Sequence, residues 1–107
     1  MKSQTQQTPL MAQYYKVKQA HPDTILLFRV GDFFETFEDD AKLTSKVLGI
    51  TLTKRSNGSL GDTPLAGFPH HAIDTYLPKL VRAGYRVAVC EQMENPKFAK
   101  GIVKREV

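Results

Sequence analysis

Five carboxylates lie within nine positions of the sequence, at Asp32, Glu35, Glu38, Asp39 and Asp40. A cluster of this kind could hold divalent metal ions and hydrolyse phosphodiester bonds, as metal-dependent nucleases do. In such nucleases, the strand that carries the metal-binding glutamate usually also has a lysine two residues after it. In this chain Glu35, Glu38, Glu91 and Glu94 are followed at that spacing by Phe37, Asp40, Met93 and Pro96. The pattern therefore argues against a nuclease.

Histidine and cysteine offer no better basis for catalysis. His70 and His71 are adjacent, so their side chains point in different directions and are poorly placed to share one metal ion. Cys90 is the single cysteine and follows three apolar residues, where a small thiol is ordinarily buried. The sequence contains no phosphate-binding glycine loop, no His-Glu-x-x-His and no Cys-x-x-Cys. We therefore expect no catalytic residue, metal site or cofactor in this chain.

An aromatic side chain and a carboxylate are paired in residues 31–37, which read Gly-Asp-Phe-Phe-Glu-Thr-Phe. On a strand, alternation places Phe33 and Glu35 on one face, about 6.6 Å apart along the chain. Such a pair places an aromatic wedge beside a hydrogen-bond acceptor. Periodicity alone favours a core position for Phe33, as for most phenylalanines.

Basic residues are concentrated in the second half of the chain. Residues 1–53 contain six Lys or Arg and six Asp or Glu, whereas residues 54–107 contain nine and five, a net charge of +4. Lys54 and Arg55, and the cluster of Lys97, Lys100, Lys104 and Arg105, could face phosphates. The same charges also suit a solvated surface without a ligand.

Length and composition indicate one folded domain, since the chain has 107 residues of which 41% are hydrophobic. The longest apolar runs are far shorter than the roughly 20 residues of a membrane span. No apolar segment follows the N-terminus, which argues against secretion and leaves the cytoplasm as the expected location. We expect residues 1–7 to be a disordered tail.

Local signals predict the elements that position these residues. Thr8 and Pro9 begin a helix over residues 9–20, and Gly31-Asp32 joins strands over 24–30 and 33–37. A second helix is expected from Asp39-Asp40 to Gly49. The remaining predictions are strands over 50–53, 64–68, 86–91 and 102–107, a turn-rich loop over 56–62, and a helix over 71–83 that contains Pro78.

This order of elements predicts an α/β (α+β) fold, with a mixed β-sheet of about five or six strands flanked by about three helices. The last strand reaches the end of the sequence without a turn or cap. We therefore expect residues 8–107 to be a domain of a longer protein.

Several blocks of sequence together resemble a known family. They are Thr8-Pro9-Leu10-Met11-x-Gln13-Tyr14, Leu26 to Glu35, Thr51-Leu52-Thr53-Lys54-Arg55, Ala66-Gly67-Phe68-Pro69-His70-His71-Ala72, Tyr76-Leu77-x-Lys79-Leu80 and Val87 to Gln92. In this order they are similar to the N-terminal mismatch-recognition domain, domain I, of bacterial MutS proteins. The resemblance covers residues 8–107.

The resemblance assigns roles to individual residues. The family motif is Gly-x-Phe-Tyr/Phe-Glu, in which the first aromatic ring wedges beside a mispaired base and the glutamate hydrogen-bonds to that base. These positions are Phe33 and Glu35 here. Phe34 stands where tyrosine is common, and we expect it on the opposite, buried face. Lys54 and Arg55 are expected to contact phosphate or sugar near the wedge.

The resemblance also implies partners. The DNA partner would be a double strand with mismatches or small loops. The full-length protein would act in DNA repair as a homodimer, with ATP and Mg bound in domains absent from this sequence and with a MutL-type repair partner. The isolated domain is expected to be monomeric and to bind DNA weakly, because it lacks the second subunit of a clamp. No membrane partner is expected.

Mispaired steps stack weakly, so a wedge and a bend cost less there than at a paired step. An ionised Glu35 could accept a hydrogen bond from thymine N3–H, whereas facing a purine N7 it would itself have to carry a proton. An alternative is that the domain is a DNA-docking or protein-interaction module of a stand-alone or mobile-element protein, without mismatch preference.

Overall fold

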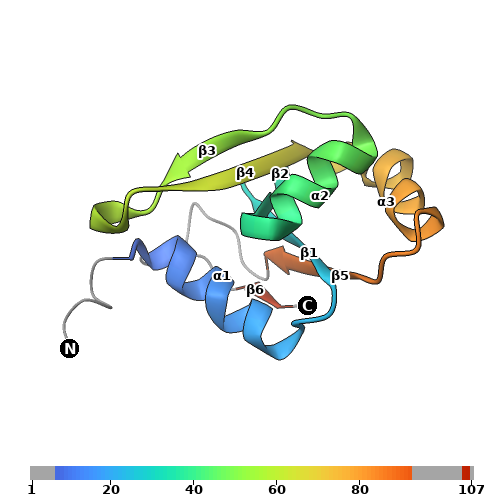
Figure 1. Cartoon of the computed structure of the whole chain (residues 1–107). Coiled ribbons are helices and arrows are strands. Elements are labelled where there is room, and N and C mark those ends of the chain that lie inside the picture. The colour runs from blue at the N-terminus through green and yellow to red at the C-terminus, as the bar shows by residue number, and fades with distance from the viewer. Residues whose placement is uncertain (1–6, 93–104, 107) are drawn as a thin grey trace.

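The fold is built on a six-stranded mixed sheet. The structure, a computed structural model, describes residues 7–92 and 105–106. Its strands are β1 (Ile25–Val30), β2 (Phe33–Phe37), β3 (Thr53–Ser56), β4 (Asp62–Pro69), β5 (Val87–Gln92) and β6 (Arg105–Glu106). They lie in the order β3-β4-β2-β1-β5-β6 (Figure 1). β1 and β5 are parallel, and the other pairs are antiparallel. The predicted mixed sheet is confirmed.

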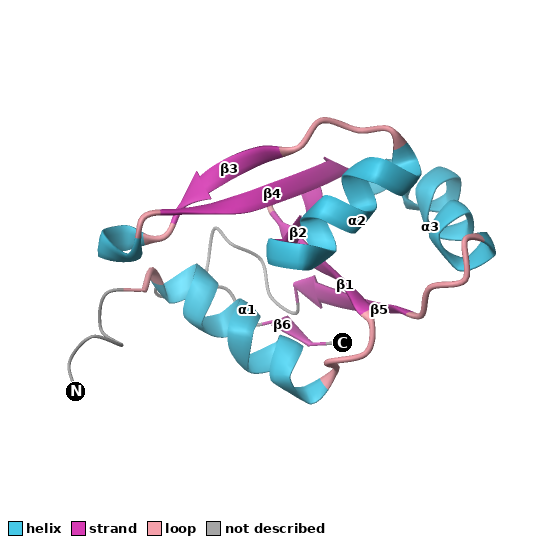
Figure 2. Cartoon of the chain, in the orientation of Figure 1, coloured by secondary structure: helices cyan, strands magenta, loops and turns pink. Residues whose placement is uncertain are grey.

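Three α-helices in the described residues cover the two faces of this sheet (Figure 2). α1 (Pro9–Ala20) packs through Met11 and Tyr14 on a cluster that includes Phe28 and Phe37. α2 (Glu38–Leu48) and α3 (Ile73–Arg82) pack on the other face, around Phe34 and other buried side chains. The predicted α+β architecture, a mixed sheet flanked by about three helices, is confirmed, and the helices lie on both faces of the sheet.

Local signals explain the helix and strand ends that the sequence predicts correctly. The Thr8 hydroxyl accepts a hydrogen bond from the Met11 N–H at 3.2 Å and so caps α1. Gly49 ends α2 with a left-handed φ of 71°, a conformation that glycine adopts without steric cost. β2 has the bounds predicted from its alternation.

The α2–β3 connection differs from the sequence prediction. The strand predicted over residues 50–53 is wrong, because β3 begins at Thr53 and includes the two basic residues that follow it. Ile50 instead packs against the cluster beneath α2 and α3. β3 pairs with β4, which begins at Asp62, so the predicted loop is shorter and contains a 3₁₀ turn, Gly58–Leu60.

The remaining boundaries differ in smaller ways. α3 is preceded by a 3₁₀ turn, His70–Ala72, and runs through Pro78. The strand predicted over residues 102–107 is described only at β6. The tail predicted over residues 1–7 and the side chains of Lys97, Lys100, Lys104 and Arg105 fall outside the described part of the structure, apart from residue 7. None of the helices described combines the length and apolar character needed to cross a membrane.

Candidate nucleic-acid interface

Phe33 opens β2 and presents its ring to solvent. Its exposed fraction is 44%, whereas that of the next residue, Phe34, is 1%. Alternation explains the contrast, because Phe34 points into the cluster under α2 and α3 while Phe33 points to the other face. The cluster under α1 includes Phe37, at the far end of the same strand, but not Phe33. An apolar ring is thus left uncovered at the edge of the core.

The β1–β2 turn that carries Phe33 is fixed by two hydrogen bonds. The Arg29 Nε–H donates to the Gly31 carbonyl at 2.7 Å, and the His70 backbone N–H donates to the Asp32 carbonyl at 2.7 Å. Gly31 adopts φ 59°, which glycine tolerates. Arg29 is itself held by Glu91 at 3.0 Å. The turn that carries Phe33 is therefore tied to β5 through Arg29 and to His70, the residue that follows β4.

Glu35 lies two residues further along β2, on the face that carries Phe33. Its Oε1 accepts a hydrogen bond from Arg55 Nη1 at 3.2 Å, and the side chains of Glu35 and Arg55 are 14% and 36% exposed. Pairing register explains their meeting: Glu35 lies opposite Gly67 of β4, and Arg55 lies opposite Thr63 of the same strand. The structure thus brings together three of the four predicted contact residues.

Lys54, the fourth predicted residue, is separated from the other three. Because side chains alternate along β3, Lys54 points to the face opposite Arg55. It is largely exposed and lies 3.4 Å from a carboxylate oxygen of Asp62. Its contact with DNA stays a prediction, at a position away from the Phe33–Glu35 pair.

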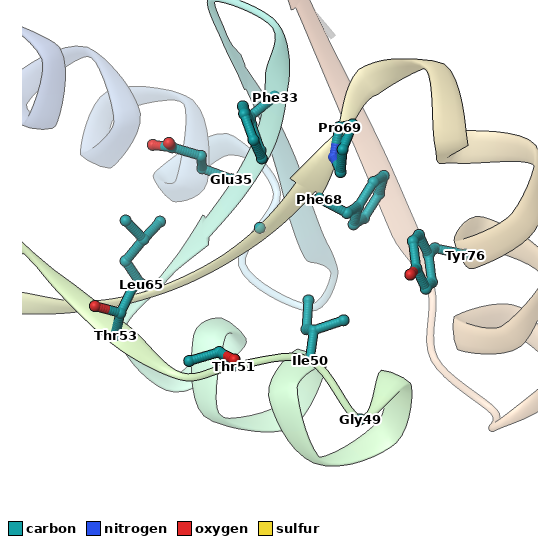
Figure 3. A pocket seen from close by; sticks show the side chains of 11 residues that line it. Phe33, Glu35, Gly49, Ile50, Thr51, Thr53, Leu65, Phe68, Pro69 and Tyr76 are labelled. Atoms are coloured by element: carbon teal, nitrogen blue, oxygen red, sulfur yellow. The ribbon is translucent and has the colours of Figure 1, made fainter.

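An open cavity of about 480 Å³ adjoins this pair. Figure 3 shows the rings of Phe33, Phe68 and Tyr76 along one side of it, with Leu65 and Thr53 across from them. The cavity is lined mainly by apolar groups, and Glu35 contributes a carboxylate. Such a lining suits contact with the edge or face of a nucleobase better than the binding of a free metal ion. Among the described residues, no group of three His, Cys, Asp or Glu side chains could hold a metal ion.

Gly67 sits on β4 between the two strands that carry the paired charges. A Cβ built at this position would lie 2.7 Å from the Phe34 carbonyl oxygen and 3.2 Å from Glu35 Cγ. Only glycine allows β2 and β4 to approach this closely.

We expect Gly67→Ala to lower the free energy of unfolding by about 1–3 kcal/mol, because backbone atoms must shift to admit the methyl group. Urea denaturation of the two chains measures the difference. Gly49→Ala is a useful comparison, since a Cβ there meets nothing within 4 Å and the cost arises only from its φ of 71°. An unchanged stability for Gly67→Ala would contradict the close approach.

A buried hydrogen-bond network anchors the β3–β4 hairpin to α1. The Asn57 Oδ1 accepts from the Thr8 N–H at 3.2 Å, and its Nδ2 donates to the Tyr15 hydroxyl at 3.5 Å. That hydroxyl donates to Glu38. Burial, followed by the hydrogen bond to Glu38, raises the pKa of Tyr15 to about 12, so the phenol keeps its proton at neutral pH. The C-terminal end of β3, the strand that carries Arg55, is thereby fixed.

Sequence reasoning missed the supporting residues Arg29, Gly67 and Asn57. The neighbouring Gly-Asp turn is a signal for Arg29, since an arginine just before a tight turn can reach a turn carbonyl. Asn57-Gly58 marks a turn in the sequence, but nothing local shows that the Asn57 side chain turns inward to α1. Gly67 could be recognised only as a strand glycine that often marks close backbone approach.

The chain is similar to known proteins over nearly its whole length. A family model for MutS domain I matches residues 8–107. The DNA mismatch repair protein MutS of Porphyromonas gingivalis is 65% identical over 101 residues, covering 94% of this chain and 11% of that protein. The protein of the same name from Flavobacterium psychrophilum is 66% identical over 101 residues, covering 94% and 12%. That of Salinibacter ruber is 61% identical over 109 residues, covering 98% and 12%.

Proposed function

Because the chain belongs to the MutS domain I family, we propose that it is the mismatched-DNA-binding module of a DNA mismatch repair protein. In this proposal Phe33 enters the minor groove at a mispair, and Glu35 accepts a hydrogen bond from the displaced base. Arg55 lies beside Glu35, and Lys54 contributes a contact to the phosphate backbone. The module performs no catalysis itself.

The exposed ring of Phe33 is the observation that carries the proposal. An apolar ring that is 44% exposed on a fixed turn can stack without rearrangement of the fold, so little binding energy is spent on ordering it. Inserting a ring between base pairs requires that they be unstacked, at a cost of a few kcal/mol at a paired step. A mispaired step is already poorly stacked, so the same insertion costs less there. Preference for mispairs follows from deformability rather than from base sequence.

Glu35 provides a second source of preference for mispaired DNA. In the minor groove of paired DNA, base edges mostly present acceptors, which repel a carboxylate. A displaced thymine or guanine presents an imino N–H, which a carboxylate accepts. The carboxylate therefore disfavours binding to paired duplex, where it is repelled by acceptors. At a mispair the hydrogen bond from the imino N–H offsets this repulsion.

The chain spans only 11–12% of the length of the curated relatives described above. We propose that the complete protein is a dimer that encloses DNA, with a MutL-type partner, and that it acts on DNA in the cytoplasm. The resemblance to MutS proteins implies that ATP and Mg would bind in other domains of that protein.

The direct test is to measure the affinity of the complete gene product for two duplexes of one sequence, with a single G·T mispair or with a G·C pair at that position. We expect at least about tenfold tighter binding of the mismatched duplex, since a difference of about 1.4 kcal/mol in deformation cost corresponds to that factor. Fluorescence anisotropy at one fixed salt concentration measures both affinities. Equal affinities would instead support a DNA-docking module without mismatch preference.

A further inference from the structure

We infer that Arg55 is a specificity-determining residue that acts through Glu35, by holding its carboxylate in the orientation that a mispaired base requires. This goes beyond the role of Arg55 as a phosphate contact, and it rests on the function proposed above. Arg55 Nη1 and Glu35 Oε1 form an ion pair at 3.2 Å within the domain itself.

The pair is built into the sheet rather than formed by two mobile surface side chains. Glu35 belongs to a central strand and its side chain is only 14% exposed. Arg55 belongs to β3, whose end is tied to α1 through the side-chain hydrogen bonds of Asn57. Gly67 lies opposite Glu35 and carries no side chain that would hinder the approach. Both ends of the ion pair are therefore placed by the core.

Arg55 can hold the carboxylate and still leave it able to recognise a base. A carboxylate offers about four lone-pair sites, and the Nη1 hydrogen bond uses one of them. A charge-assisted hydrogen bond restricts the carboxylate to a narrow range of orientations. Loss of that bond removes part of the constraint on the Glu35 side chain, so more of its ordering would have to occur when DNA binds, at a cost in conformational entropy.

This cost would be paid only where Glu35 bonds to a base. On paired DNA the minor groove offers the carboxylate only the guanine amino group as a base donor, among acceptors, so its orientation matters less than at a mispair. On mismatched DNA the orientation determines the strength of the new hydrogen bond. Loss of Arg55 should therefore weaken mismatched binding more than paired binding, whereas loss of a plain phosphate contact weakens both by the same factor.

A double-mutant cycle in the complete gene product separates these cases. The wild type, Arg55→Gln, Glu35→Gln and the double variant are compared for the ratio of paired to mismatched dissociation constants, with the two duplexes described above. We expect Arg55→Gln to reduce this ratio about twofold to fivefold when Glu35 is present. In the Glu35→Gln background the same change should leave the ratio within about 1.5-fold. Equal effects in both backgrounds would overturn the inference.

Two further variants control for charge and folding. Arg55→Lys keeps the charge but not the planar guanidinium, so overall affinity should be largely restored while the ratio recovers only in part. If thermal melting shows that Arg55→Gln does not fold, Arg55→Lys replaces it in the double-mutant cycle. Lys54→Gln removes the proposed phosphate contact on the opposite face of β3, so it should weaken binding of both duplexes by the same factor and thereby leave only their ratio unchanged. A change in ratio equal to that of Arg55→Gln would contradict a role specific to Arg55.

The wild-type measurement keeps the two proposals distinguishable. If the wild type shows no mismatch preference, the proposed function itself fails. If the wild type prefers the mismatch but the cycle is additive, the proposed function stands and only the inference about Arg55 fails.

Discussion

Phe33→Ala is expected to bring the affinity of the complete gene product for mismatched duplex to within about twofold of its affinity for paired duplex. Stacking of an aromatic side chain on a base contributes about 1–3 kcal/mol, or about fivefold to 150-fold in affinity, and alanine cannot replace it. Because the ring is 44% exposed in the unbound domain and lies outside both core clusters, its removal should cost little stability.

Anisotropy titrations with the two duplexes measure the change in preference, and thermal melting measures the change in stability. Leu52→Ala is a matched control, since this side chain is exposed to a similar degree, at 46%, but is not among the residues that line the cavity beside Phe33 and Glu35. It should leave the mismatch preference intact. A Phe33→Ala variant that keeps a tenfold preference would contradict the wedge.

Phe34→Ala is expected to have the opposite phenotype, lowering the free energy of unfolding by about 3–5 kcal/mol. Its ring is 1% exposed, lies 6.1 Å from the ring of Phe68, and has the Arg29 guanidinium 5.9 Å from its centroid. The substitution leaves a large cavity beneath α2 and α3, and it removes the surface on which Arg29 rests. A loss of this size is a large fraction of the stability of a small domain.

Urea denaturation of the 107-residue chain, with the wild type and Phe33→Ala in parallel, measures this difference. Phe34→Leu should recover more than half of the loss, because leucine refills most of the volume. The two substitutions should thus have different effects: Phe33→Ala reduces mismatch preference, and Phe34→Ala reduces stability. Equal destabilisation by the two alanine variants would show that Phe33 is also a core residue.

Elements with strong local signals were predictable from the sequence. Thr8-Pro9 defines the start of α1, Gly49 defines the end of α2, and alternation defines β2. β3 was not predictable, because the apolar residues just before it suggested a strand over residues 50–53, whereas β3 begins at Thr53. The observed position of β3 depends on its pairing with β4. Ile50 does not belong to this strand and packs against the core cluster beneath α2 and α3.

The candidate site divides in the same way. Period-two alternation places Phe33 and Glu35 on one face, and it also separates Lys54 from Arg55 once β3 is known to be a strand. The meeting of Arg55 with Glu35 depends on two registers, β2 with β4 and β3 with β4, which no local pattern encodes. Sequence reasoning therefore finds the residues but not the ion pair between them.

The direct junction between β2 and α2 limits how this domain can change in length. Phe37 ends the strand and Glu38 begins the helix, with a left-handed φ of 56° at Glu38. Asp40, in the first turn, accepts from the Leu26 N–H at 3.1 Å and pairs with Lys18 at 2.9 Å. One inserted residue would rotate the helix by about 100° and carry Asp40 away from both partners. Insertions and deletions should consequently be rejected at this junction and tolerated better in the exposed turn Gly58–Leu60, beyond the anchored Asn57, which makes that turn the natural place for a spectroscopic tag.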